Sequence, residues 1–225
     1  MSLAPHYESL CTGNVSARRA FVWDRRLQAR LATDMQDIAQ ETIERCQDGN
    51  AAAFAEVVDR YERPLFAYVC RLRCTPVGLE PEDVVQEIFL KTYQAIHRFQ
   101  WRANGSFSTW LFSIARNHCI SLIRRRHVEG RRRDADQGDV ADVADQRQLG
   151  PAEAASQTEA AAHAADAVAS LPEPMRSAFV LRYYQDMAYA GIAEVLDCDE
   201  GTARTRVARA KKALARYLQG EGNTD

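Results

Sequence analysis

Apolar residues recur at spacings of three and four along almost the whole stretch from residue 36 to residue 127. This period places them on one face of each successive helix, and no run alternates apolar and polar residues as a half-buried strand would. Apolar residues make up 46% of the 225-residue chain, enough to build hydrophobic cores. The sequence therefore predicts an all-α protein.

Residues that start or interrupt helices divide this first stretch. Pro64 is expected to kink or divide the first long helix. Glu80-Pro81-Glu82-Asp83 favours a helix start, because acidic side chains are stabilised near the positive end of a helix dipole. Ser106 or Ser108 would cap the next helix. The expected buried faces are Phe54, Val57, Val58, Tyr61, Leu65 and Phe66; then Val84, Val85, Ile88, Phe89, Tyr93 and Ile96; then Leu111, Ile114, Ala115, His118 and Leu122.

The composition changes after residue 133. Residues 134–166 contain eight acidic side chains and one basic side chain, Arg147, for a local charge of about −7. Few residues there are able to form a core, so we expect a linker that is flexible at least in its first half. The Ala-rich part from 152 to 169 is compatible with a helix.

A second compact unit is predicted from residue 171. Leu171-Pro172-Glu173-Pro174 introduces a helix, and a short helix follows from Tyr189 to Leu196. Asp197-Cys198-Asp199 then forms a polar break before a long helix from about Glu200 to Leu218. A short helix, a tight break and a longer helix are typical of a helix-turn-helix motif.

The last helix has one apolar and one basic face. Six bases and no acid lie between residues 201 and 219. Such a helix fits the DNA major groove, where arginine pairs with guanine and lysine neutralises phosphate. A solvated face on an ordinary bundle helix is the alternative. The expected core stripe is Ala203, Val207, Ala210, Leu214, Tyr217 and Leu218.

Aromatic residues lie beside a second basic patch. The segment "FQWRANGSFSTWLFSIARN" (99–117) holds two of the three tryptophans, and seven arginines with one acid follow between residues 116 and 133. Aromatic rings stack on unpaired bases while cations follow the backbone, so this combination suits single-stranded nucleic acid. Trp101 and Arg102 are the better candidates for exposure, whereas Phe107, Trp110 and Phe112 are expected to divide between core and ligand.

Three stretches of the chain resemble one family. "EDVVQEIFLKTYQAIHRF", "SFSTWLFSIARNHCISLIRRR" and "LPEPMRSAFVLRYYQDMAYAGIAEVLDCDEGTARTRVARAKKAL" are similar to the extracytoplasmic-function (ECF) class of bacterial sigma factors of the sigma-70 family, over roughly 50–128 and 171–218. The resemblance implies two small helical domains joined by a flexible acidic linker. The expected boundaries are 1–35 for a flexible N-terminal extension, 36–133 for sigma region 2, 134–168 for the linker, 169–219 for the region 4 helix-turn-helix domain, and 220–225 for a tail.

The resemblance also implies roles for individual residues. Residues 99–107 match the family's specificity loop, which captures a flipped non-template base. Region 2 would read and melt the minus-ten element through Trp101, Arg102, Asn104, Ser106, Arg116, Asn117, Arg124 and Arg125. Region 4 would read the minus-thirty-five element through Thr202, Arg204, Thr205, Arg206, Arg209 and Lys212. Core polymerase would be bound by Asp83, Gln86, Glu87 and Phe89.

The implied function is that of a promoter-specificity subunit and not of an enzyme. It would bind the clamp helices and flap of core RNA polymerase, promoter duplex and the melted non-template strand, with an anti-sigma factor as a further partner. No catalytic residue, metal or cofactor and no stable homo-oligomer is expected. The location would be cytoplasmic, on the nucleoid in holoenzyme or held at the membrane by the anti-sigma factor, and the sequence shows neither a signal peptide nor a membrane span.

Two other classes remain open at this point. A stand-alone helix-turn-helix repressor or activator would explain residues 171–218 but leaves the "DVVQEIF" helix and the aromatic loop without a role. A metal- or redox-dependent protein would use the six cysteines or the histidines His97, His118 and His163. No CxxC pair, phosphate loop or zinc signature supports that class, and free thiols in a reducing cytosol are expected.

Overall fold

The computed structural model describes residues 37–76, 79–101, 106–136 and 155–218, and every regular element within them is a helix. The predicted N-terminal extension, the first half of the predicted linker and the tail lie outside the described residues. The elements are α2 (Gln40–Gln47), α3 (Ala51–Leu72), α4 (Pro81–Ala95), the 3-10 helix η2 (Ile96–Arg98), α5 (Phe107–Asp136), α6 (Ala155–Ser170), α7 (Glu173–Tyr183), α8 (Tyr189–Val195) and α9 (Glu200–Leu218).

Helices α2 to α5 form the first group, in which α3 packs against α2, α4 and α5. Helix α3 runs without interruption through Pro64, so Pro64 does not divide it. A proline inside a helix removes one backbone hydrogen bond. Here Tyr61 and Leu65 on either side of it are buried, and their packing holds the helix together across that site.

Helix α4 begins where the sequence predicts. Pro81 occupies its first turn, and the backbone N–H of Glu80 donates to Oδ2 of Asp83 at 3.0 Å. Its buried face differs at one position from the expected one. Tyr93 is 46% exposed and its ring packs edge-on against Phe54, whereas Thr92 is buried and its hydroxyl donates to the carbonyl of Ile88. A helix hydrogen bond satisfies the threonine hydroxyl, which lets it replace an apolar residue in the core.

Helices α7, α8 and α9 form the second group, in which α9 packs against both of the others. Asp197, with φ of 49°, makes the turn between α8 and α9. Asp199 then caps α9, because its Oδ1 accepts from the backbone N–H of Thr202 at 2.7 Å. Buried residues of α9 are Ala203, Val207, Ala210 and Leu214, while Tyr217 and Leu218 are partly buried.

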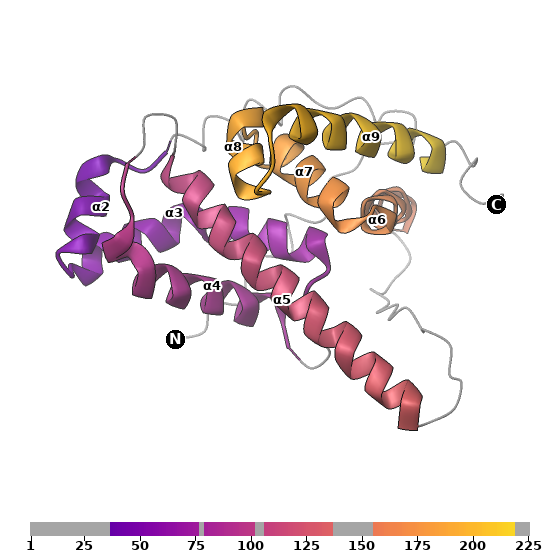
Figure 1. Cartoon of the computed structure of the whole chain (residues 1–225), viewed down its shortest axis with the longest axis horizontal. Helices are drawn as coiled ribbons and strands as arrows, with labels where there is room; N and C mark the ends of the chain where they lie inside the picture. Colours follow the sequence, from indigo (N-terminus) through magenta and orange to yellow (C-terminus); the bar gives the residue numbers. More distant parts are fainter. Residues whose placement is uncertain (1–36, 77–78, 102–105, 137–154, 219–225) are drawn as a thin grey trace.

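The two groups touch each other directly. Helix α8 packs on α5, and α6 and α7 pack on α3, so the second group covers one side of the first (Figure 1). Nε2 of the buried Gln185 donates to the carbonyl of Pro64 at 3.2 Å. Nη1 of Arg176 donates to the carbonyl of Leu72 at 3.1 Å, at the C-terminal end of α3. This end has carbonyls without partners inside the helix, and a cation is favourable there.

Close approach between α8 and α5 depends on a glycine. A Cβ added to Gly191 would lie 3.0 Å from Oγ1 of Thr109 on α5 and 3.0 Å from Cγ of Met187. A larger residue at this position would therefore push the two helices apart. Among the described residues, no helix has the length and apolar character needed to cross a bilayer.

Candidate functional site

The basic face of α9 is the first of three candidate surfaces. Thr205, Arg209 and Lys212 are exposed on the side away from the core stripe, as predicted, and Arg206 is partly buried at its edge. The capping residue Asp199 lowers conformational freedom at the N-terminus of this helix. Its own pKa is held below the ordinary value, chiefly by hydrogen bonds from Thr202.

Arg204 is held differently from the other bases of this helix. Its guanidinium pairs with Glu200 one turn earlier and lies 4.7 Å from the centre of the Tyr189 ring on α8. Cation–π contact of this kind restricts the side chain. Arg204 therefore contacts Glu200 on its own helix and the Tyr189 ring on α8, although it is exposed like Arg209 and Lys212.

An aromatic cluster of Phe99, Trp101, Phe107 and Trp110 forms the second candidate surface. Phe99 and Phe107 are buried, and the Phe99 ring centre lies 5.1 Å from both Trp101 and Trp110. Trp101 is 37% exposed at the edge of this cluster. Phe107 and Trp110 thus belong to the core and its margin, and Trp101 is the ring that presents a face to solvent.

The predicted specificity loop, residues 99–107, is described only at its two ends. Arg102 and Asn104 lie outside the described residues. Ser106 lies at the other end, where its Oγ accepts from the backbone N–H of Thr109 at 3.1 Å. Ser106, and not Ser108, is therefore the residue whose side chain caps α5 in this way.

The predicted minus-ten residues on α5 fall on two different sides. Asn117 and Arg124 are exposed and seven residues apart, so they share one face, with the exposed Arg125 beside it. Arg116 points elsewhere. Its side chain is 15% exposed, and its Nε lies 3.6 Å from Oε1 of Glu173 on α7. The structure brings Asn117, Arg124 and Arg125 together and places Arg116 at the contact between the two helical groups.

A third candidate surface lies along α4. Asp83, Gln86 and Glu87 are exposed at helical spacing, and Leu90 continues the same face with 58% of its surface exposed. Phe89 is 7% exposed and its ring packs edge-on against Phe54. Sequence reasoning missed Leu90 because leucine is normally counted as core, although its spacing from Asp83 and Glu87 places it on the polar face.

His118 of α5 lies beside the third surface. It is buried on α5, and its Nε2 lies 3.0 Å from Oε2 of Glu87 on α4, close but not aligned as a hydrogen bond. Burial lowers the pKa of His118, with Glu87 opposing this effect and Lys91 and Arg125 adding to it. The imidazole is therefore neutral at physiological pH.

Five of the six cysteines lie in the described residues, and Cys11 lies outside them. Cys46, Cys70, Cys74, Cys119 and Cys198 all carry free thiols. Within the described ranges, no three His, Cys, Asp or Glu side chains converge as metal ligands do. The three surfaces on α4, α5 and α9 are therefore the candidates for function.

Comparisons with known proteins match both helical groups to one family. Residues 57–128 match the family model Sigma-70 region 2, and residues 164–214 match Sigma-70, region 4. The RNA polymerase sigma-H factor of Pseudomonas aeruginosa is 33% identical over 196 residues, which cover 84% of this chain and 97% of that protein. The ECF RNA polymerase sigma-E factor of Escherichia coli K12 is 33% identical over 187 residues, covering 80% and 94%.

Solved structures of similar fold agree with this match. The sigma factor RpoE of Bartonella quintana, crystallised with the anti-sigma factor NepR, has a TM-score of 0.55 and 26% identity over 74% of this chain and 96% of its own. CnrH, solved in complex with the cytosolic domain of CnrY, has a TM-score of 0.58 over 80% of this chain and 96% of its own. At 23% identity, CnrH is similar in fold.

Proposed function

Because this chain belongs to the ECF group of sigma-70 family RNA polymerase sigma factors, we propose that its three surfaces divide the work of promoter-specific transcription initiation. The face of α4 binds core polymerase through its clamp helices. Region 2 melts and reads the minus-ten element, and α9 of region 4 reads the minus-thirty-five element in duplex DNA. The protein acts in the cytoplasm as a regulatory subunit and performs no catalysis of its own.

The observation that carries this proposal is the presence of both matched regions, in order, in one chain, with several of the expected readers exposed in each. Arg209 and Lys212 on α9 and Asn117 and Arg124 on α5 are all open to solvent. A helix with a basic outer face suits the major groove, and an exposed ring beside exposed arginines suits an unpaired strand.

The polymerase-binding surface is proposed to use Leu90 as its apolar centre. Asp83, Gln86 and Glu87 lie on the same face in the two turns before it, which places an exposed apolar side chain beside polar ones, as at the edge between core and rim of a protein interface. Phe89, buried against Phe54, would support the helix from beneath. An anti-sigma factor is a further proposed partner, as in the RpoE–NepR complex, and competition for this face is the simplest way for it to act.

Transcription with purified core polymerase tests the function. The chain, core enzyme and genomic fragments are combined, and transcripts are mapped to their start sites. Promoter-dependent transcripts that require the chain support the proposal. A chain that binds duplex DNA by itself but yields no transcripts with core enzyme would instead be a stand-alone helix-turn-helix regulator.

A further inference from the structure

The segment that precedes the family-matched region contacts both ends of the specificity loop. Asp37 lies just before α2 and outside residues 57–128. Its Oδ2 accepts from the backbone N–H of Phe107 at 2.8 Å, and its Oδ1 accepts from that of Ser108 at 3.1 Å. These N–H groups belong to the first turn of α5 and have no partner within that helix, and a carboxylate is favourable at this end.

The hydroxyl of Tyr61 on α3 fixes this carboxylate. It donates to Oδ1 of Asp37 at 2.7 Å, and the Tyr61 ring centre lies 5.7 Å from that of Phe107. Burial, with the nearby charge of Asp37, raises the pKa of Tyr61 far above its ordinary value. The hydroxyl therefore stays protonated and remains a donor. Asp37 thus joins α3 to the start of α5.

Gln47, at the last position of α2, holds the other end of the loop. Its Nε2 donates to the carbonyl of Phe99 at 2.8 Å and to that of Ile96 at 3.1 Å. Phe99 is the first residue of the specificity loop, and its ring contacts Trp101. One short helix and the residue just before it therefore supply a hydrogen-bonding group to each end of the loop.

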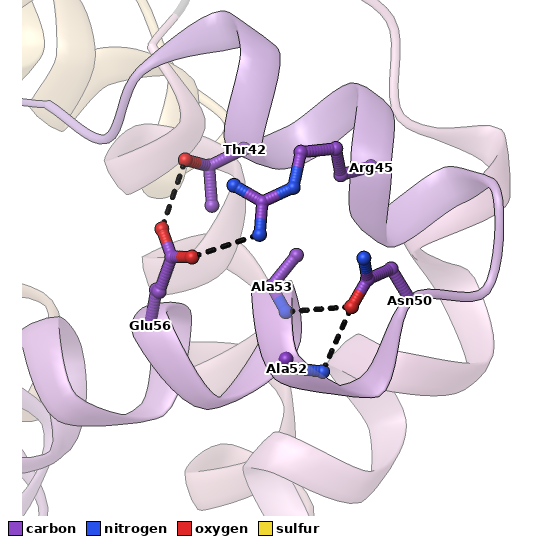
Figure 2. Close-up of polar contacts among 6 residues, drawn as sticks. All are labelled: Thr42, Arg45, Asn50, Ala52, Ala53 and Glu56. Atoms are coloured by element: carbon purple, nitrogen blue, oxygen red, sulfur yellow. Dashed lines mark hydrogen bonds and ion pairs between the residues drawn. The ribbon is translucent and has the colours of Figure 1, made fainter.

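Helix α2 is itself fixed to the long scaffold helix α3. Figure 2 shows Glu56 of α3 between two side chains of α2. Its Oε2 accepts from Oγ1 of Thr42 at 3.2 Å, and its Oε1 accepts from Nη2 of Arg45 at 3.0 Å. Two contacts from one carboxylate restrain the rotation of α2, which bears Gln47 at its end.

The turn between α2 and α3 is also specified. Oδ1 of Asn50 accepts from the backbone N–H groups of Ala52 and Ala53, at 3.0 and 3.1 Å, and so caps α3 (Figure 2). Gly49 precedes it with φ of 84°, a conformation that favours glycine. The turn therefore sets the direction of α2 relative to α3, and α2 is fixed to the first helical group.

We propose that Asp37 and Gln47 are positioning residues that hold the two ends of the specificity loop and so fix Trp101 for promoter melting. The aromatic cluster lies between the two anchored ends, with Phe107 held by Asp37 and Phe99 by Gln47. Neither residue needs to touch DNA. The proposal rests on the proposed function, because it assigns Trp101 the task of meeting a melted base.

A first experiment measures the anchoring without DNA. Amide hydrogen exchange of Phe107 and Ser108 is compared in the full chain and in Asp37→Ala, Asp37→Asn and Asp48→Asn. Loss of a charged acceptor should speed exchange at these two amides on the order of tenfold in Asp37→Ala, and less in Asp37→Asn, which keeps one oxygen. Asp48 is exposed and directly follows α2, so Asp48→Asn is expected to leave the exchange rates of both amides unchanged.

A second experiment measures the function in holoenzyme. Gln47→Glu keeps the size of the side chain but replaces the donor with an acceptor that faces two carbonyl oxygens. With 2-aminopurine in the minus-ten element, we expect Gln47→Glu and Asp37→Asn to slow melting at least several-fold. Binding to duplex that carries only the minus-thirty-five element should not change. Gln40→Ala, whose amide donates to Glu44 on the same exposed turn, is the control for α2.

The outcomes separate the two proposals. Faster amide exchange together with slower melting supports the positioning role. Unchanged exchange, or faster exchange with melting equal to that of the control variants, overturns it. Thermal unfolding of every variant shows whether slower promoter melting reflects a general loss of fold. If binding to the minus-thirty-five duplex slows to the same degree, both residues act through stability alone. A wild-type chain that directs no transcripts with core enzyme overturns the proposed function itself.

Discussion

His118 is a buried histidine of α5 that lies against α4, whose exposed face is the proposed polymerase-binding surface. Its neutral imidazole lies against Glu87, which is itself half exposed. Two cations, Lys91 and Arg125, act against protonation together with burial. A group of this kind makes the stability of region 2 depend on pH.

The sign of this dependence follows from the lowered pKa of His118 in the folded chain. Below its ordinary pKa of about 6.5, the unfolded chain takes up a proton more readily than the folded chain, so stability falls as pH drops from about 7 to 5. Above that range neither state is protonated and the effect disappears. His118→Gln should flatten this part of the profile in urea unfolding, and the exposed His97→Gln should not; equal profiles for both variants would contradict the prediction.

At the scale of single elements, α9 allows a matched comparison of two arginines. Arg209 and Arg216 are both exposed and seven residues apart on the same face. The N-terminal part of a recognition helix usually enters the groove, so Arg209 is nearer to the bases. Arg209→Ala should weaken binding to minus-thirty-five duplex by about 1–3 kcal/mol and relax sequence preference. Arg216→Ala should produce a smaller loss of DNA binding that does not depend on sequence. A DNA titration in which Arg216→Ala weakens binding more than Arg209→Ala would reject this placement.

Two neighbouring residues of α4 should affect different properties: Phe89 the stability of the fold and Leu90 the binding of core polymerase. Phe89→Ala removes a buried ring and should cost about 3–5 kcal/mol of unfolding free energy. Leu90→Ala should leave stability almost unchanged, since the side chain is 58% exposed, but weaken binding to core polymerase by more than 1 kcal/mol if it is central to the interface. Chemical denaturation and a polymerase-binding titration give the two quantities, and a Leu90→Ala variant with full affinity would exclude it from the interface.

The sequence predicted elements best where local chemistry marks their ends. Helix α9 begins as expected, because the Asp197–Asp199 break before it contains both the turn residue and the helix cap. Tyr93 was placed wrongly, since its exposure depends on how far α3 covers α4 and not on helical spacing. The contact between Arg116 and Glu173 joins residues 57 positions apart and depends on the docking of α7, which no local pattern encodes.

At the scale of the whole molecule, the described residues place the two helical groups in contact. Minus-ten and minus-thirty-five elements are separated by about 25 base pairs, or roughly 85 Å of duplex at 3.4 Å per step. The two groups are joined here by hydrogen bonds such as those of Gln185 and Arg176. The Nε atoms of Arg116 and Arg176 are buried here without a hydrogen bond among the described residues, which weakens this interface.

Gly191→Leu should therefore open the molecule. The new side chain would meet Thr109 across the interface, while leucine favours the helical state of α8 more than glycine does. We expect a larger radius of gyration by small-angle X-ray scattering and little change in the folding of either group. Ala190→Leu places the same side chain on the exposed neighbouring position and should stay compact. Identical scattering from the two variants would show that this contact does not hold the groups together.

Helix α5 runs without a break from Phe107 to Asp136 and extends past the other helices (Figure 1). Its rise of 1.5 Å per residue separates the backbone at Phe107 from that at Arg124 by about 26 Å, the length of seven or eight base-pair steps. The helix therefore fixes the separation of these two points. An insertion of one residue between these points would shift Arg124 by 1.5 Å and rotate it by about 100°. Under the proposed function, the distance along the promoter between a captured base and the contact of Arg124 would be set by the number of residues between them in α5.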